Sequence, residues 1–385
     1  MEDIHSLVRR IHETPWRLVL VAAGGGVQAI AELFKVPGAS RTVLEAVIPY
    51  SSPALESWLH GKPDHACAES TARSMAMAGF LRARQLEQTE GKAPVAPVAG
   101  VSCTASLVTD RPKKGDHRVH VAIQRVDITR SFSLVLTKGV RTRIEEEQIA
   151  SELFLQAMAS ACDLEPDWSL PLVANEVLEH HMAEAPESWQ KLILGECDIV
   201  ALGTPADWQR GRPPVLFPGA FNPLHVGHLR MAQIAEAKTG RAVEFEISIL
   251  NADKPPLDYV EIRRRVEQFS LQDRVWLTRL PTFVEKARRF PQATLVVGID
   301  TLLRIADPRY YGHDPSVRDR AVKEIAERGC RFLVFGRCWH GRFLGLKDVD
   351  VPDDLRRLCT EIPEAEFRED ICSTQLRSDA NKKDD

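Results

Sequence analysis

The stretch GAFNPLHVGHLR, Gly219 to Arg230, contains two histidines three residues apart, after an apolar run and before a helix-like sequence. We expect a strand to end at Phe217, the backbone to turn at Gly219, and His225 and His228 to enter the next helix. Residues three apart share a helix face, so both imidazoles can point at one ligand. The N-terminus of a helix carries partial positive charge and free N–H donors, which suit a phosphate.

Two other interpretations of the histidine pair stay open at this point. Histidine pairs also bind zinc, but no third and fourth ligand is evident nearby, and the eight cysteines form no CxxC pair. Alternatively, two histidines simply begin a helix and have no ligand. Taken alone, the pair does not decide between a functional and a structural role.

Around the histidine turn, apolar runs alternate with helical patterns. The apolar runs that indicate strands are 214–221, 242–250, 275–280, 294–300 and 331–337. The expected helices are 228–240, 259–270, 282–290 and 319–329. This alternation predicts an α/β domain whose parallel sheet is covered on both faces. Ligands of such sheets bind at the carboxyl ends of the strands, where the histidine turn lies.

The first half of the chain also mixes strands and helices. The sequence WRLVLVAAGGGVQAIAELF predicts a strand through Val21, a glycine turn at Gly24 to Gly26 and an amphipathic helix. Further strands are expected within 100–109 and 117–137, and further helices at 67–88 and 141–162. A chain of 385 residues is expected to form two domains. We assign 1–164 to the first domain, 165–212 to a structured connector with a helix at 174–185 and a strand at 197–202, and 213–380 to the second.

Composition narrows the class of protein. Apolar residues make up 44 %, charged residues 27 %, and the formal net charge is −4, so nucleic acid is not an expected partner. We interpret basic stretches such as EIRRRVEQ as solvated helix faces near the site rather than nucleic-acid patches. No segment approaches the run of about 20 apolar residues that crosses a bilayer, and the N-terminus lacks the apolar core of a signal peptide. We therefore expect a cytoplasmic protein without a membrane partner.

A second anion site is predicted near the C-terminus, in EDICSTQLRS. Ser373 and Thr374 can cap a helix, and Arg377, one turn further, can form two hydrogen bonds to phosphate oxygens. A plain N-cap would explain the serine and threonine by themselves. Together with the histidine turn they favour a phosphate site.

These motifs resemble those of a known family. GAFNPLHVGH is similar to the GxFxPxHxGH signature, and ICSTQLR to the ISSTxxR signature, of the HxGH nucleotidylyltransferases, over roughly residues 213 to 378. Within this superfamily the sequence looks closest to nicotinamide or nicotinate mononucleotide adenylyltransferases. The resemblance implies a Rossmann-like domain that transfers AMP from ATP, or a nucleotidyl group from another nucleoside triphosphate, to a phosphorylated small-molecule acceptor and releases pyrophosphate.

The resemblance also implies roles for individual residues. The implied catalytic residues are His225, His228 and Arg377. The implied nucleotide-binding residues are Gly219, Ala220, Phe221, Gly227, Gly298, Asp300, Ser373 and Thr374. Lys254 in NADKPPL is a weaker match as a substrate-phosphate contact, and Pro218 departs from a motif that often begins with two glycines. Mg²⁺ is expected with the triphosphate rather than in a protein site. A cytidylyltransferase acting on another acceptor, and a non-catalytic nucleotide sensor, stay open as alternatives.

The first half resembles the CinA C-terminal family, the nicotinamide mononucleotide amidohydrolases, over approximately residues 6 to 162. Tyr50 matches the family's tyrosine, but Ala22 stands in place of the nucleophilic serine and Leu55 in place of the lysine. The resemblance therefore implies a domain without amidohydrolase activity. The turn at Gly24 to Gly26 could still bind a nucleotide phosphate, or could only permit close packing of helix on strand. Related domains self-associate, so a homo-oligomer formed through this half is a further expectation.

Overall fold

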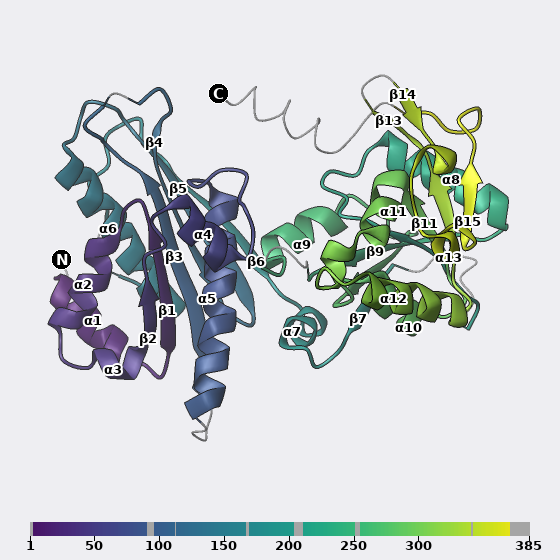
Figure 1. Cartoon of the computed structure of the whole chain (residues 1–385). Coiled ribbons are helices and arrows are strands. Elements are labelled where there is room, and N and C mark those ends of the chain that lie inside the picture. Colours follow the sequence, from purple (N-terminus) through teal and green to yellow (C-terminus); the bar gives the residue numbers. More distant parts are fainter. Residues whose placement is uncertain are drawn as a thin grey trace. The chain divides into compact units, whose positions relative to one another are not determined.

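The computed structural model describes residues 3–90, 96–111, 113–166, 169–203, 211–250, 255–339 and 342–369 (Figure 1). The chain forms two compact units, one made of 1–194 and 253–263 and the other of 195–252 and 264–385. The segment expected as a connector, 165–212, is thus divided between the units. Among the described residues, no helix combines the length and the apolar character needed to span a membrane.

The first unit is built on a mixed six-stranded sheet with the order β2-β1-β3-β4-β5-β6. Its strands are β1 (Arg17–Ala23), β2 (Val43–Val47), β3 (Val98–Ser106), β4 (His117–Gln124), β5 (Ile128–Leu136) and β6 (Leu178–Glu184). Its helices are α1 (Ile4–Glu13), α2 (Val27–Lys35), α3 (Ala39–Thr42), α4 (Ser52–Leu59), α5 (Glu69–Glu90), α6 (Arg143–Ala161) and α7 (Glu187–Leu194). Strand β1 is parallel to β2 and β3, and the remaining neighbours are antiparallel.

Strand β1 is buried on both faces because its side chains alternate between two cores. Leu18 and Leu20 pack in the core that includes α1, α2 and α6. Val19 and Val21 pack against α4 and α5 on the other face (Figure 1). This burial explains why the strand reads as a continuous apolar run.

The helix expected at 174–185 is wrong, because this segment contains strand β6. Residues Leu178 to Glu184 pair antiparallel with β5, and the ring of His180 stacks on Phe132 with 5.0 Å between centroids. Leu, Glu, Met and Ala favour helices, but the intrinsic preference is a few tenths of a kcal/mol per residue. Pairing along the edge of an existing sheet outweighs it.

A second stretch of chain, 253–263, completes the first unit. Asp258 forms an ion pair with Arg73 of α5, with 3.2 Å between Oδ2 and Nε. Tyr259 is fully buried, its hydroxyl donates to the Val126 carbonyl at 2.6 Å, and its backbone N–H donates to Thr129 Oγ1 at 3.0 Å. The start of helix α9 (Tyr259–Val266) is therefore part of the core of the first unit, whereas its end belongs to the second.

The second unit contains a seven-stranded sheet with the order β15-β12-β11-β8-β9-β10-β7. Its strands are β7 (Ile199–Leu202), β8 (Val215–Pro218), β9 (Val243–Ser248), β10 (Arg274–Thr278), β11 (Thr294–Gly298), β12 (Arg331–Phe335) and β15 (Cys359–Ile362), with a separate hairpin of β13 (Arg337–Trp339) and β14 (Arg342–Leu344). Its helices are the end of α9 and α8 (Val226–Thr239), α10 (Phe283–Arg289), α11 (Ile299–Ala306), α12 (Pro315–Glu327) and α13 (Asp353–Arg356), with the 3-10 turns η1 (Pro308–Tyr311) and η2 (Leu346–Asp348). All sheet neighbours are parallel except β7 and β10.

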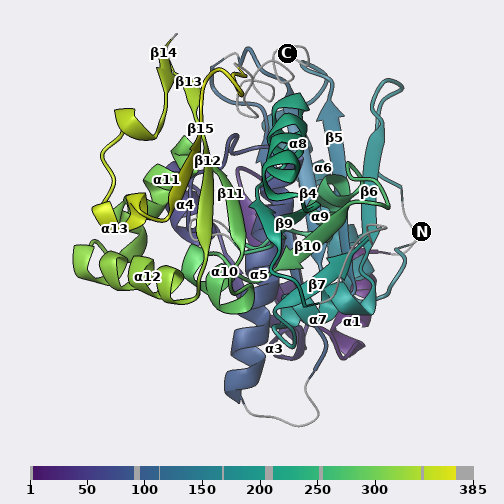
Figure 2. The same cartoon turned by 90° about the vertical axis from the view of Figure 1, so that its right-hand side faces the viewer.

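This strand order places a topological switch point beside the histidine turn. After the edge strand β7, the chain enters the middle of the sheet at β8, adds β9 and β10 on one side, and then adds β11, β12 and β15 on the other. Helices α10 and α12 cover one face of the sheet and α8 the other (Figure 2). The expected α/β architecture with a Rossmann-like sheet is confirmed. Ligands of such folds bind where the strand order reverses, here beyond the carboxyl ends of β8 and β11.

A buried ion pair connects helix α10 to the sheet of the second unit. Lys286 of α10 places Nζ 2.8 Å from Glu246 Oε1 of β9, and both side chains are almost completely buried. Lys286 also donates to the Leu280 carbonyl, and Thr278 donates its hydroxyl to the same carboxylate. These partners satisfy both charges inside the protein.

Candidate functional site

The histidine turn begins at the end of β8 and is anchored by an aromatic cluster. The N–H of Gly219 donates to the Glu246 carbonyl at 2.9 Å. A side chain at position 219 would lie 2.6 Å from the Phe221 ring, which explains the glycine. Phe221 is buried, and its ring packs edge-on against Phe217 and Phe269 with 5.4 Å between centroids in each case. Its φ of 43° lies in the left-handed region, so burial of this ring holds an unfavourable backbone conformation.

The two histidines lie together at the N-terminus of α8. His225 is the N-cap, and His228 occupies the third helical position. Their rings are stacked, with 3.7 Å between centroids and 24° between planes. Gly227 makes this possible, because a Cβ there would stand 3.1 Å from the His225 ring. The structure thus brings His225, Gly227 and His228 together at the start of α8.

A backbone hydrogen bond sets the protonation pattern of His228. The N–H of His225 donates to His228 Nδ1 at 3.3 Å, so Nδ1 is an acceptor and a neutral ring carries its proton on Nε2. Among the described residues, Nδ1 of His225 has no hydrogen-bond partner. The protein therefore determines the tautomer of His228 more strictly than that of His225.

Burial keeps both rings neutral. It lowers the pKa of His228 to about 3, with a smaller contribution from His225. The pKa of His225 is also lowered, mainly by burial and then by the positive charge of Arg337, while Glu369 acts in the opposite direction. At neutral pH the pair can donate hydrogen bonds without carrying charge, which suits a site whose ligand supplies the charge.

We predict that His228 of the free protein stays neutral far below pH 6.5. Unfolded histidine binds a proton near pH 6.5, whereas folded His228 does so only near pH 3. The unfolded state therefore binds more protons between these values, and this group makes the fold less stable as pH falls from 6.5 towards 3. NMR titration of ¹⁵N-histidine, with the His228 signal assigned from its absence in His228→Gln, should show a neutral ring at pH 5. Protonation of that ring near pH 6.5 would contradict the prediction.

The carboxyl end of β11 supplies a second group of predicted residues. The pairing of β8 with β11 covers Val215 and Leu216 only, after which β11 continues to Gly298 beside β12. Asp300 follows in the first turn of α11. A side chain at position 298 would stand 2.7 Å from Asp300 Oδ1, so the glycine leaves room for this carboxylate. Gly298 and Asp300 thus lie at the same edge of the sheet as the histidine turn.

Arg337, which the sequence interpretation missed, connects these two groups electrostatically. It follows β12, and its Nη1 lies 3.3 Å from Asp300 Oδ2. Its charge also contributes to the lowered pKa of His225. A cation directly after a parallel strand was the available signal, because all such positions meet at one edge of the sheet.

Helix α9 and the residues after it hold the histidine turn from another side. Arg264 Nη2 donates to Asn222 Oδ1 at 2.5 Å, and Arg265 Nη1 donates to the Ala220 carbonyl at 3.0 Å. These arginines of EIRRRVEQ thus lie beside the histidine turn, and the side chain of Arg264 is exposed. The sequence did not show which groups of the turn, some 40 residues earlier, these arginines contact. Ala220 itself is exposed.

Glu369, at the end of the described chain, approaches the same helix terminus. Its Cβ lies 3.7 Å from where a Cβ on Gly227 would stand, and its Oε1 lies 3.8 Å from Arg230 Nε. The predicted residues Ser373, Thr374 and Arg377, and likewise Lys254, lie outside the described residues.

The glycine turn of the first unit contacts protein groups. Glu147 Oε1 of α6 accepts the N–H of Val27, at the N-terminus of α2, at 2.8 Å. A Cβ on Gly24 would stand 2.0 Å from the Ala105 carbonyl oxygen, and one on Gly26 2.8 Å from Cys103 Sγ. A carboxylate of the protein thus takes the position that an anion would occupy. These contacts favour the packing role of the glycines over phosphate binding.

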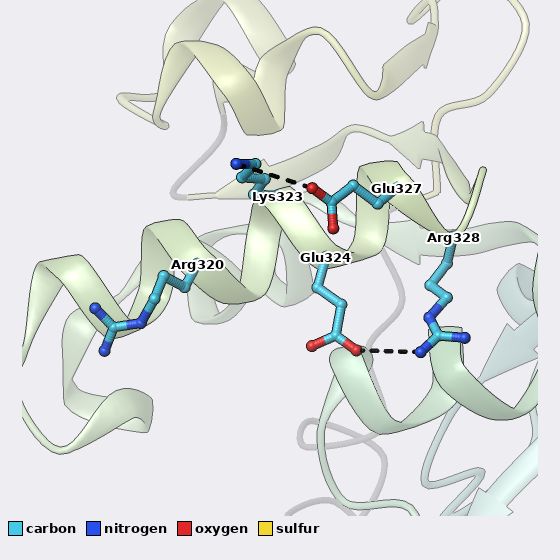
Figure 3. Close-up of a pocket in the computed structure, with 5 residues that line it drawn as sticks. All are labelled: Arg320, Lys323, Glu324, Glu327 and Arg328. Atoms are coloured by element: carbon cyan, nitrogen blue, oxygen red, sulfur yellow. Dashed lines mark ion pairs between the residues drawn. The ribbon is translucent and has the colours of Figure 1, made fainter.

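A hollow of about 550 Å³ on α12 lies elsewhere (Figure 3). Its lining residues are Arg320, Lys323, Glu324, Glu327 and Arg328. Lys323 pairs with Glu327 and Arg328 with Glu324, as the dashed lines show. The end of α12 leads into the start of β12, so the hollow lies at the amino ends of the strands, away from the histidine turn. Within the described parts of the chain, no three His, Cys, Asp or Glu side chains gather as metal ligands.

Comparison with known proteins gives a family-model match for the C-terminal part of the chain and several solved structures for the N-terminal part. Residues 216–379 match the family model described as cytidylyltransferase-like. The competence/damage-inducible protein CihA from Agrobacterium tumefaciens is similar to the N-terminal part, with 19 % identity, a TM-score of 0.33, and coverage of 42 % of this chain and 96 % of that chain. A CinA-superfamily protein from Escherichia coli has 15 % identity, a TM-score of 0.31, and coverage of 41 % of this chain and 90 % of that chain. A CinA-superfamily protein from Enterobacter cloacae has 16 % identity, a TM-score of 0.33, and coverage of 42 % of this chain and 92 % of that chain. No curated protein matches the chain. The cytidylyltransferase-like domain supports a nucleotidyltransferase-type function.

Proposed function

We propose that the second unit transfers AMP from ATP to a phosphorylated acceptor such as nicotinamide or nicotinate mononucleotide and releases pyrophosphate. The observation that carries this proposal is the stacked pair of His225 and His228 at a helix N-terminus, at the switch point of a parallel sheet. The partial positive charge of a helix N-terminus and neutral imidazole donors suit the oxygens of a triphosphate. The cytidylyltransferase-like match over residues 216–379 supports the same reaction class.

The second predicted motif follows Glu369 closely in the sequence, with Ser373 four residues after it. Glu369 lies beside Gly227. We propose that Ser373, Thr374 and Arg377 bind the outer phosphates, and that Lys254 contacts the phosphate of the acceptor.

The proposed reaction is an in-line displacement at the α-phosphorus. An oxygen of the acceptor phosphate forms the new P–O bond, the bond to the bridging oxygen breaks, and pyrophosphate leaves with the electron pair. The nucleophile is already ionised, so the reaction needs positioning and charge stabilisation rather than a strong base. His228, with its proton on Nε2, donates a hydrogen bond to an oxygen of the triphosphate. Mg²⁺ enters as part of the triphosphate substrate.

The test is pyrophosphate release by the full chain, with ATP, CTP, GTP or UTP each offered with a panel of mononucleotides and other phosphorylated acceptors. We expect release with ATP and a pyridine mononucleotide. A second candidate, favoured by the description of the matched family, is transfer of CMP to another acceptor. Release with CTP alone would select it, and absence of release in every combination would leave a nucleotide-binding sensor.

We propose that the first unit does not hydrolyse amides. Ala22, at the expected position of the nucleophile, is a buried residue of β1, and Leu55, at the position of the lysine, is buried in α4. Neither side chain can attack a carbonyl or activate a nucleophile. Incubation of the full chain with nicotinamide mononucleotide should therefore release no ammonia, and enzyme-dependent release would refute this.

A further inference from the structure

The histidine turn is bridged by a single amide side chain. Gln268 Oε1 accepts the N–H of Leu224 at 2.7 Å, and Gln268 Nε2 donates to the Phe221 carbonyl at 2.9 Å. The same Nε2 donates to the Arg265 carbonyl at 3.2 Å, one turn earlier in its own segment. A glutamine amide has one acceptor oxygen and two N–H donors, so the oxygen and both donor positions are used. This network also determines which end of the amide faces which backbone group.

The bridged segment leads directly into the histidine pair. Residues 221–224 include Phe221, whose φ is 43°, and end one residue before His225. The direction of the His225 N–H depends on the peptide that joins it to Leu224, and this N–H is the donor to His228 Nδ1. Gln268 therefore binds the N–H of Leu224, and the N–H of the next residue, His225, determines the tautomer of His228. Arg264 donates to the Asn222 side chain and Arg265 to the Ala220 carbonyl, whereas Gln268 binds the backbone at both ends of the segment 221–224.

We propose that Gln268 is a positioning residue for the histidine pair. Its bridge keeps the peptide before His225 in the orientation that donates to His228 Nδ1, and so keeps the proton of His228 on Nε2, where it can reach a phosphate oxygen. This inference rests on the proposed function and deepens it. It adds a residue that would act on the reaction through the turn rather than by touching the substrate.

The decisive variants are Gln268→Ala and Gln268→Glu, with Gln272→Ala as the matched control. The side chain of Gln272 is exposed. Gln268→Ala removes the bridge, and we expect kcat to fall roughly tenfold to a hundredfold, with KM changed less than about threefold. Gln272→Ala should retain the activity of the wild type. Activity of Gln268→Ala equal to that of Gln272→Ala would overturn the proposal.

The variant Gln268→Glu distinguishes the bridging role from a purely structural one, because only the bridging role predicts an activity that depends on the protonation of residue 268. An ionised carboxylate accepts from Leu224 but repels the Phe221 carbonyl, whereas a protonated carboxyl has one acceptor and one donor, like the amide. The activity of this variant relative to wild type should therefore rise as pH falls from 7.5 to 5. A ratio that does not change with pH would contradict the bridging role.

A spectroscopic readout separates this inference from the proposed function. In ¹⁵N-histidine NMR, His228 of the wild type should show a proton on Nε2, and Gln268→Ala should shift part of the population to Nδ1. If the wild-type protein releases no pyrophosphate with any substrate, the proposed function is wrong. The comparison of the His228 tautomer in wild type and Gln268→Ala still tests the positioning role of Gln268. An unchanged tautomer in Gln268→Ala would overturn the positioning role even in an active enzyme.

Discussion

Replacing His228 with alanine should lower kcat by roughly a hundredfold to a thousandfold, the effect of removing one donor to a developing oxyanion. His228 is half-buried, is held neutral, and has Nδ1 occupied by the His225 N–H, so its remaining function is donation from Nε2. Alanine removes that donor. Pyrophosphate release under saturating substrate measures the effect directly.

The matched control for this variant is His228→Gln. The amide nitrogen of glutamine can take a position close to imidazole Nε2 and can donate a hydrogen bond. We expect His228→Gln to retain more activity than His228→Ala. The ring of His228 packs near Phe221, with 5.1 Å between centroids, so thermal unfolding must show that both variants are folded. Full turnover by a folded His228→Ala protein would exclude His228 from the reaction.

Replacing Lys286 with methionine should destabilise the second unit by about 3–5 kcal/mol. Methionine fills a similar volume, but it leaves the carboxylate of Glu246 buried without its cation. The hydroxyl of Thr278 remains as a hydrogen-bond donor and does not neutralise the charge. Hydrogen exchange of the β9 and β10 amides should report this loss as faster opening, because these strands carry Glu246 and Thr278.

An exposed ion pair in the same unit provides the comparison. Lys323 lies 3.9 Å from Glu327 on the surface of α12, and Lys323→Met should change stability by no more than about 1 kcal/mol. Changing both partners in Glu246→Gln/Lys286→Met should recover part of the loss, because no unpaired charge remains. If Lys286→Met is as stable as Lys323→Met, the buried pair does not contribute as we infer.

The sequence predicted most of the sheet strands because each is buried on at least one face. Strands β8 and β11 read as short apolar runs, and the alternation with helices indicated the parallel order. The histidine pair was predictable for a different reason. Its members are three residues apart in the chain, so local helix geometry alone brings the rings of His225 and His228 together.

What the sequence could not show depends on contacts between distant residues. Gln268 and Arg264 reach a turn more than 40 residues away, and no local pattern distinguishes them from other polar residues of a helix end. Strand β6 has the composition of a helix, and it is a strand because β5 offers it an edge. The position of Arg337 after β12 indicates the sheet edge at which it lies, but its ion pair with Asp300 depends on the order of the strands.

The return of residues 253–263 to the first unit makes that unit discontinuous in sequence. A fragment that stops at residue 194 would lack Tyr259, a fully buried side chain, and would leave Arg73 without the carboxylate of Asp258. One cut in the chain therefore cannot yield two intact halves. Assigning an activity to either half will require point substitutions in the full-length protein, or a fragment in which residues 253–263 are joined to residues 1–194.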